Sequence, residues 1–148
     1  MKQFKGKNAI WFVMSFLIYN LLPLLLIGKE LNISNKFVII TLLILYYCGN
    51  LIVLPFMLRN RVELFDDYFM FYYGFGKQKI YIKDIKEIKK SHNPIASSAN
   101  SFDRIYIATN QTELYISLRK NDEFIQMIKD KISQWIKLFR AVLKLIFK

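Results

Sequence analysis

The sequence predicts an α+β membrane protein: a two-helix transmembrane hairpin, then a small antiparallel β-barrel or sandwich with a C-terminal α-helix. Three observations predict this fold class. Two long runs without a charged residue occupy the first part of the chain. Short β-like runs separated by turn residues follow, and an apolar stripe at helical spacing ends the chain.

The apolar runs are residues 9–27 and 37–58, which contain 19 and 22 residues and no charge. A helix needs about 20 apolar residues to cross a bilayer, so both runs qualify. The first run is longer than a signal peptide's apolar region and lacks a small-residue cleavage site, which predicts a retained anchor. We expect Asn20 and Asn50 to hydrogen-bond between the helices rather than to line a transport path.

Basic residues near the ends of the runs predict the orientation. Three lie before the first run and three follow the second, against two between the runs: Lys2, Lys5, Lys7, then Arg59, Arg61, Lys77, against Lys29 and Lys36. Lys and Arg are enriched on the cytoplasmic side of membrane proteins. We therefore expect a multi-pass protein of the cell membrane with two spans, both termini in the cytoplasm and a short external loop.

The charged half begins with runs that favour strands, at 62–65, 68–73, 77–82 and 84–90. Asp66-Asp67 separates the first two and Gly74-Phe75-Gly76 the next two. Isoleucines at 82, 85 and 88 also fit a helix, but we interpret this stretch as strand, broken at Asp84.

The clearest hairpin joins residues 104–108 to residues 113–118, because apolar and polar side chains alternate in both. This alternation predicts that Leu114, Ile116 and Leu118 face a core.

A C-terminal helix is predicted from Asn121 or Asp122, since either caps a helix well. Its apolar residues recur every three or four positions. Residues 133–148 contain no acidic side chain, which predicts a basic amphipathic extension lying in the cytoplasmic membrane interface. Its expected membrane-surface contacts are Trp135, Lys137, Phe139, Arg140, Lys144, Phe147 and Lys148. Alternatively, the same face packs on the protein's own sheet or on a partner subunit.

Residues 60–131 resemble a bacterial pleckstrin-homology (PH) domain of the short kind found in small membrane proteins. The resemblance is carried by the aromatic strand and glycine turn at 68–74 with residues 80–88, by 93–107, and by 114–125. It implies a barrel-like antiparallel sheet capped by the C-terminal helix, and no catalysis. Some relatives with this layout resemble bacteriocin self-immunity proteins. The acidic Asp66-Asp67 turn stands where phosphoinositide-binding members have basic residues, so no such site carries over.

The domains are therefore 1–58 as the transmembrane hairpin, 60–131 as the PH-like domain and 132–148 as the helix extension. No catalytic, cofactor-binding or metal-binding motif occurs, and His92 and Cys48 are the only residues of their types. We expect His92 to be exposed and Cys48 to pack as a small apolar residue between the helices.

The net charge of +11 suits nucleic acid or an anionic membrane, and the apolar half favours the membrane. The sequence thus predicts a non-enzymatic, membrane-anchored PH-like binding module without a cofactor, with bacteriocin self-immunity as its most specific form. The alternative is a structural or accessory subunit of a membrane transporter or envelope assembly. Expected partners are a bilayer with an anionic inner leaflet, a peptide or membrane protein, and a second copy in a homo-oligomer, but no nucleic acid.

Overall fold

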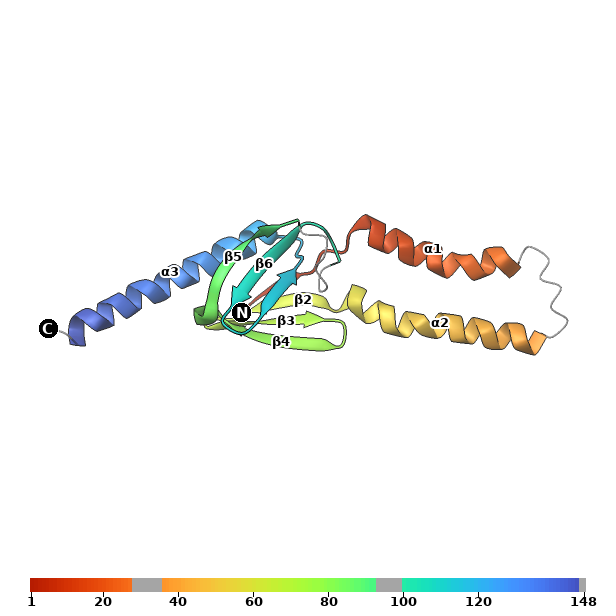
Figure 1. The fold of residues 1–148 in the computed structure, drawn as a ribbon, viewed down its shortest axis with the longest axis horizontal. Helices are drawn as coiled ribbons and strands as arrows, with labels where there is room; N and C mark the ends of the chain where they lie inside the picture. Colours follow the sequence, from red (N-terminus) through yellow and green to blue (C-terminus); the bar gives the residue numbers. More distant parts are fainter. Residues whose placement is uncertain (28–35, 93–99, 147–148) are drawn as a thin grey trace.

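The computed structural model describes residues 1–27, 36–92 and 100–146, so the predicted external loop and most of the 91–101 loop lie outside the described residues. The elements are β1 (Lys2–Lys5), α1 (Ile10–Ile27), α2 (Lys36–Leu58), β2 (Asn60–Leu64), β3 (Tyr68–Tyr73), β4 (Gly76–Tyr81), the 3-10 turn η1 (Ile82–Asp84), β5 (Ile85–Ser91), β6 (Arg104–Thr109), β7 (Glu113–Ile116) and α3 (Asn121–Ile146). The α+β class, with antiparallel sheets and a C-terminal helix, is confirmed (Figure 1).

The strands form two antiparallel sheets, in the orders β1-β2-β3-β4 and β5-β6-β7. The predicted hairpin is confirmed, because Ile105 faces Ile116 and Ile107 faces Leu114 across β6 and β7. The predicted break between two strands near Asp84 is confirmed, but Ile82 and Asp84 belong to the 3-10 turn η1 and not to strands, and the next strand begins at Ile85.

The first strand lies before the apolar helices in the sequence, although it belongs to the domain that follows them. β1 pairs antiparallel with β2, so that Lys2 faces Leu64 and Lys5 faces Arg61. The helices α1 and α2 are therefore inserted between two neighbouring strands of one sheet. The sequence pattern predicts for Lys2 and Lys5 only a place in the flank of the first apolar run, and their strand is a finding of the structure.

Of the two predicted arrangements, barrel or sandwich, the structure shows two separate sheets and no closed barrel. The turn η1 separates β4 from β5, and an isolated bridge between Gly6 and Leu118 connects the other edges of the two sheets. Backbone bonds reinforce this corner: the Lys7 amide donates to the Ser117 carbonyl (2.9 Å) and the Arg119 amide to the Lys5 carbonyl (3.0 Å). In the described part of the chain no longer ladder joins the sheets, which therefore remain two separate layers.

One apolar core fills the space between the sheets and α3. Phe124 of α3 is fully buried and meets Phe4 of β1 and Phe69 of β3 edge to face, at ring-centre distances of 5.2 and 5.5 Å. Burying one such ring contributes about 1.5–3 kcal/mol. Leu114, Ile116 and Leu118 are also buried, as their alternation predicted. The first turns of α3 thus close the open end of the sheet pair.

The helices α1 and α2 lie side by side and leave the domain together (Figure 1). The predicted bond between the two asparagines is confirmed, because the Asn50 amide nitrogen donates to the Asn20 amide oxygen. The Tyr19 and Tyr46 rings stack at 4.3 Å, and the Tyr19 hydroxyl donates to the Tyr46 carbonyl (2.9 Å). Cys48 is exposed on α2, so its predicted packing between the helices is wrong.

Among the described residues, one helix segment is long and apolar enough to cross a membrane, Ile39–Leu58 of α2. The corresponding stretch of α1, Ile10–Pro23, is shorter.

Candidate membrane anchor and contact surfaces

The end of α2 is attached to the domain by side chains that bond to its last carbonyl groups. These carbonyls have no partner within their own helix and need other donors when buried. Asn100 Nδ2 donates to the Phe56 carbonyl (2.9 Å), and Asn8 Nδ2 donates to the Met57 carbonyl (2.9 Å). Asn100 Nδ2 also donates to Asn8 Oδ1 (2.8 Å). The three segments that meet here therefore hold one another in place.

The same junction fixes the start of α1 and the end of β3. The Ala9 amide donates to the Asn100 carbonyl (2.9 Å), and the Tyr73 hydroxyl donates to Asn100 Oδ1 (2.7 Å). Asn100 is 3% exposed, so these bonds lie away from water and are strengthened by the low local polarity. Burial raises the pKa of the Tyr73 phenol, which keeps this donor protonated at neutral pH.

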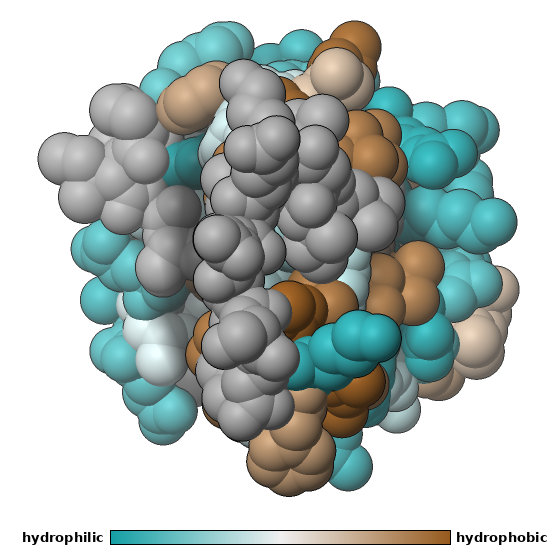
Figure 2. Space-filling model, turned by 90° about the vertical axis from the view of Figure 1, so that its right-hand side faces the viewer, coloured by the Kyte–Doolittle hydropathy of each residue, from teal (hydrophilic) through white to brown (hydrophobic). Residues whose placement is uncertain are grey.

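The outer surface of the helix pair is apolar and is not covered by the domain. No residue in the Ile39–Leu58 segment is buried, and Leu45 and Leu51 are 65% and 70% exposed. Figure 2 looks along the helix pair from the right of Figure 1 and shows several groups of hydrophobic side chains, with hydrophilic ones mostly around the rim. Soluble proteins rarely expose contiguous apolar patches of more than a few hundred Å².

The C-terminal part of α3 forms a second uncovered apolar surface. The helix packs on the core through Phe124 and Ile128 and partly through Ile132, after which it projects away from the domain. Of the predicted contact residues, Trp135 and Phe139 are 41% and 65% exposed. Lys137, Arg140 and Lys144 are exposed too, whereas Phe147 and Lys148 lie outside the described residues. The described tail does not pack on the protein's own sheet.

The tail leaves the domain at the end opposite to α1 and α2 (Figure 1). An ion pair lies where the helix leaves the core, because Lys131 of α3 donates to Asp66 in the β2–β3 turn (3.0 Å). This hydrogen bond is the main cause that lowers the pKa of the Asp66 carboxyl. The tail would reach a leaflet entered by α1 and α2 only if α3 turned back along the domain.

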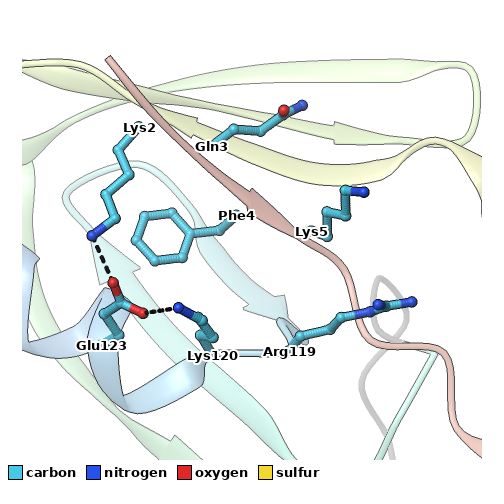
Figure 3. A pocket seen from close by; sticks show the side chains of 7 residues that line it. All are labelled: Lys2, Gln3, Phe4, Lys5, Arg119, Lys120 and Glu123. Atoms are coloured by element: carbon cyan, nitrogen blue, oxygen red, sulfur yellow. Dashed lines mark hydrogen bonds and ion pairs between the residues drawn. The ribbon is translucent and has the colours of Figure 1, made fainter.

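A shallow groove of about 280 Å³ lies between β1 and the first turn of α3. Figure 3 shows that Lys2 and Lys120 both point to Glu123, at 2.6 and 2.9 Å. These two bonds lower the pKa of the Glu123 carboxyl. Lys5 and Arg119 also line the groove, and they form no ion pair with any residue that the structure describes. The groove is cationic, but it presents no buried polar group to a cofactor.

Asp103, directly before β6, and Arg104, the first residue of β6, bind different partners. Asp103 accepts a hydrogen bond from Lys7 at 2.8 Å, and Arg104 Nε donates to the Ser101 carbonyl at 2.6 Å. The Lys7 bond is the main cause that lowers the pKa of the Asp103 carboxyl. Since Lys7 follows β1, this pair is a further link between the N-terminal segment and the domain.

The described residues contain no group of three or more His, Cys, Asp or Glu that could hold a metal ion. His92 is exposed, as predicted.

A family model described as "Bacterial PH domain" matches residues 49–132, which is more than half of the chain. The chain belongs to the bacterial PH domain family. The match begins within α2 and runs through all strands from β2 to β7 into α3. The strand β1 lies outside the match and completes the first sheet of the PH-like domain from the N-terminal side of the helix pair. No curated protein and no solved structure matches the chain at a significant level.

Sequence reasoning missed two parts of this arrangement. It gave no role to Asn8 and Asn100, because isolated polar residues in connecting segments carry no periodic signal. It also missed β1, whose residues Lys2–Lys5 include one apolar side chain. The one apolar residue, Phe4, among basic and polar neighbours is the sequence signal that points to this strand.

Proposed function

We propose that the chain is a non-enzymatic PH-like binding module anchored in the cell membrane by two crossings, α1 and α2. The observation that carries this proposal is the pairing of β1 with β2. Two strands bonded along their length lie on the same side of any bilayer. If α2 crosses, the chain must cross once more between β1 and β2, and α1 is the apolar helix available for that crossing.

The length of α1 supports this view. Its 18 residues, Ile10–Ile27, measure about 27 Å at 1.5 Å per residue, against a hydrocarbon core of about 30 Å. Its charge-free sequence and the exposed apolar side chains of both helices fit a lipid environment. The six flanking basic residues against two between the helices support a cytoplasmic location of the PH-like domain and of both termini.

Two measurements test the anchor and its orientation. The full chain should remain in the membrane fraction after alkaline carbonate extraction. A reporter active only outside the cytoplasm should work when inserted within residues 31–35 and should fail when fused after Lys148. Release by carbonate would refute the anchor, and the reverse reporter pattern would refute the orientation.

The most specific form of the proposal is bacteriocin self-immunity, which rests on the family resemblance. Expression in a bacterium sensitive to a peptide encoded beside this gene should raise the inhibitory concentration of that peptide. An unfolded variant, Ile116→Lys, is the matched control because Ile116 is fully buried. Equal sensitivity with the native chain and the control, for every peptide encoded nearby, would refute immunity.

A second candidate function is an accessory subunit of a membrane assembly, and the tail of α3 favours it. The exposed apolar side chains of Leu138, Phe139 and Leu145 lie at the end of the domain opposite to α1 and α2. A partner protein can cover such a surface there, whereas lipid contact requires the helix to turn back. Each tail cation at an anionic leaflet would contribute about 1 kcal/mol to such lipid contact.

Tryptophan fluorescence separates these two roles of the tail. With Trp11→Phe, Trp135 becomes the sole tryptophan of the full chain. Quenching of Trp135 by brominated lipids in protein-free liposomes would support membrane contact. Unquenched emission in liposomes, together with protection of the tail when a neighbouring membrane protein is co-expressed, would support the subunit role.

A further inference from the structure

The turn between β3 and β4 lies against the last turn of α2. Gly74 in this turn has φ 56°, a left-handed conformation that favours glycine, and a Cβ there would lie 2.4 Å from the Phe56 ring of α2. The next residue, Phe75, places its ring edge to face with Phe56, with 6.0 Å between centres. Phe75 is nevertheless 66% exposed.

The position of Phe56 along α2 shows how deep the β3–β4 turn would lie in a bilayer that α2 crosses. Phe56 precedes Arg59 by three residues, which is about 4.5 Å along a helix. It lies inside the apolar segment Ile39–Leu58. A bilayer crossed by α2 with its boundary at Arg59 therefore reaches the level of Phe75. At that level the exposed ring would contact lipid.

A second aromatic side chain occupies the same level beside the other helix. Phe102 lies in the segment before β6, 49% exposed, with its ring centre 5.6 Å from that of Trp11. Trp11 is the second residue of α1 and is 48% exposed. Aromatic residues gather at the boundary between hydrocarbon and headgroups.

Three cations stand near the Phe75 turn: Arg59 directly before β2, Arg61 on β2 and Lys77 on β4. Arg59 and Arg61 lie 5.6 and 4.6 Å from the Tyr72 ring, and Lys77 is the register partner of Tyr72. One carboxylate, Glu63, lies close, 3.1 Å from Arg61. The exposed Phe75 ring matches the acyl chains of a leaflet, and the excess positive charge next to it matches the layer of anionic phosphates.

We propose that Phe75 and Phe102 insert into the headgroup boundary of the leaflet that α1 and α2 enter, and hold the PH-like domain directly against anionic lipid. This inference rests on the proposed anchor and adds a second membrane contact to it. The two rings flank the helix pair, so the domain is fixed in one orientation. The cationic groove at β1 and the tail of α3 lie outside this contact surface and do not touch the leaflet.

The test uses the full chain with Trp11→Phe and Trp135→Phe, reconstituted in vesicles of equal parts phosphatidylcholine and phosphatidylglycerol. Tryptophan is then introduced by Phe75→Trp or Phe102→Trp. Lipids brominated near the headgroup end of the acyl chain should quench both probes and their emission should be blue-shifted. The matched control is Tyr81→Trp, at the far end of β4, which should keep its emission. These vesicles contain no other protein, so quenching reports lipid contact.

A probe within the span keeps this inference separate from the anchor itself. Leu45→Trp, 65% exposed near the middle of α2, should be quenched by lipids brominated deep in the acyl chain. Quenching of Leu45→Trp with no more quenching at position 75 than at position 81 would overturn the inference and leave the anchor standing. No quenching at either depth would overturn both. If Phe75→Trp fails to fold, a nitroxide on Phe75→Cys in a Cys48→Ala background measures the same depth from its oxygen accessibility.

Discussion

Replacing Phe4 with alanine should destabilise the whole PH-like domain, although Phe4 stands before both apolar helices. Its side chain is 3% exposed and packs on Phe124 at 5.2 Å, in the middle of the core. A buried Phe→Ala change costs about 3–5 kcal/mol, because the transfer free energy of the ring is lost and a cavity remains. The free energy of unfolding of a small domain is about 5–15 kcal/mol in total, so this loss is a large part of it.

The assay is hydrogen–deuterium exchange of the full chain in detergent micelles, followed by mass spectrometry. Backbone amides of β2 and β3 exchange through opening of the domain, so their protection reports its stability. Since about 1.4 kcal/mol corresponds to a factor of ten, Phe4→Ala should lower this protection by about two to three and a half orders of magnitude. The helices α1 and α2, which lie outside this core, should keep their protection.

Gln3→Ala is the matched control, because Gln3 is the neighbouring residue on the exposed face of the same strand. It should change the protection of β2 and β3 by less than about threefold, as surface substitutions do. If Phe4→Ala had no larger effect than Gln3→Ala, β1 would not belong to the core. The argument for an even number of crossings would then lose its basis.

Three further predictions follow from single contacts. Ile116→Lys should unfold the domain, since an unpaired buried charge costs several kcal/mol. Tyr115→Lys, on the other face of the strand, should destabilise the domain less. Equal effects of the two changes on protease resistance would contradict the register. Gly74→Ala should destabilise the full chain by about 1–3 kcal/mol, because the new Cβ strains a left-handed residue and meets a ring of α2; an unchanged melting temperature would contradict this geometry. Because Lys7 lowers the pKa of Asp103, their bond stabilises the fold above the unfolded-state pKa of about 3.9 and is lost as pH falls through the lower folded-state value. Asp103→Asn should remove that part of the acid sensitivity, about 0.2–1 kcal/mol for a pair so exposed, in urea unfolding measured from pH 6 to about pH 3.

The parts of the fold that follow local patterns could be predicted from the sequence. The strands at 104–109 and 113–116 alternate with period two, and the start of α3 has both a capping residue and an apolar stripe. Each signal lies within a few residues of the element that it describes. The separation of the strand signals at Asp84 also corresponds to a physical break, the turn η1.

The parts that depend on distant partners could not be predicted. Phe4 is a single apolar residue among lysines, and its partner strand begins at Asn60. The junction at Asn100 depends on three segments meeting, so no one segment reveals it. Cys48 illustrates the same limit, because periodicity in a uniformly apolar helix does not tell which side meets the other helix. The exposure of the α3 tail also depends on where the domain ends, which composition alone does not show.

The short connections between the helices and the sheet couple α1 and α2 mechanically to the PH-like domain. Four residues separate β1 from α1, and Arg59 alone separates α2 from β2. Asn8 and Asn100 donate hydrogen bonds to the last carbonyl groups of α2, so the helices can move little relative to the sheet at this junction. A change in the spacing of α1 and α2 at the domain must therefore either shift β1 against β2 or break these part-buried hydrogen bonds, at up to about 1–3 kcal/mol for each polar group left unpaired away from water. Binding of a partner to the PH-like domain and movement of the two helices therefore affect each other through the β1–β2 strand pair.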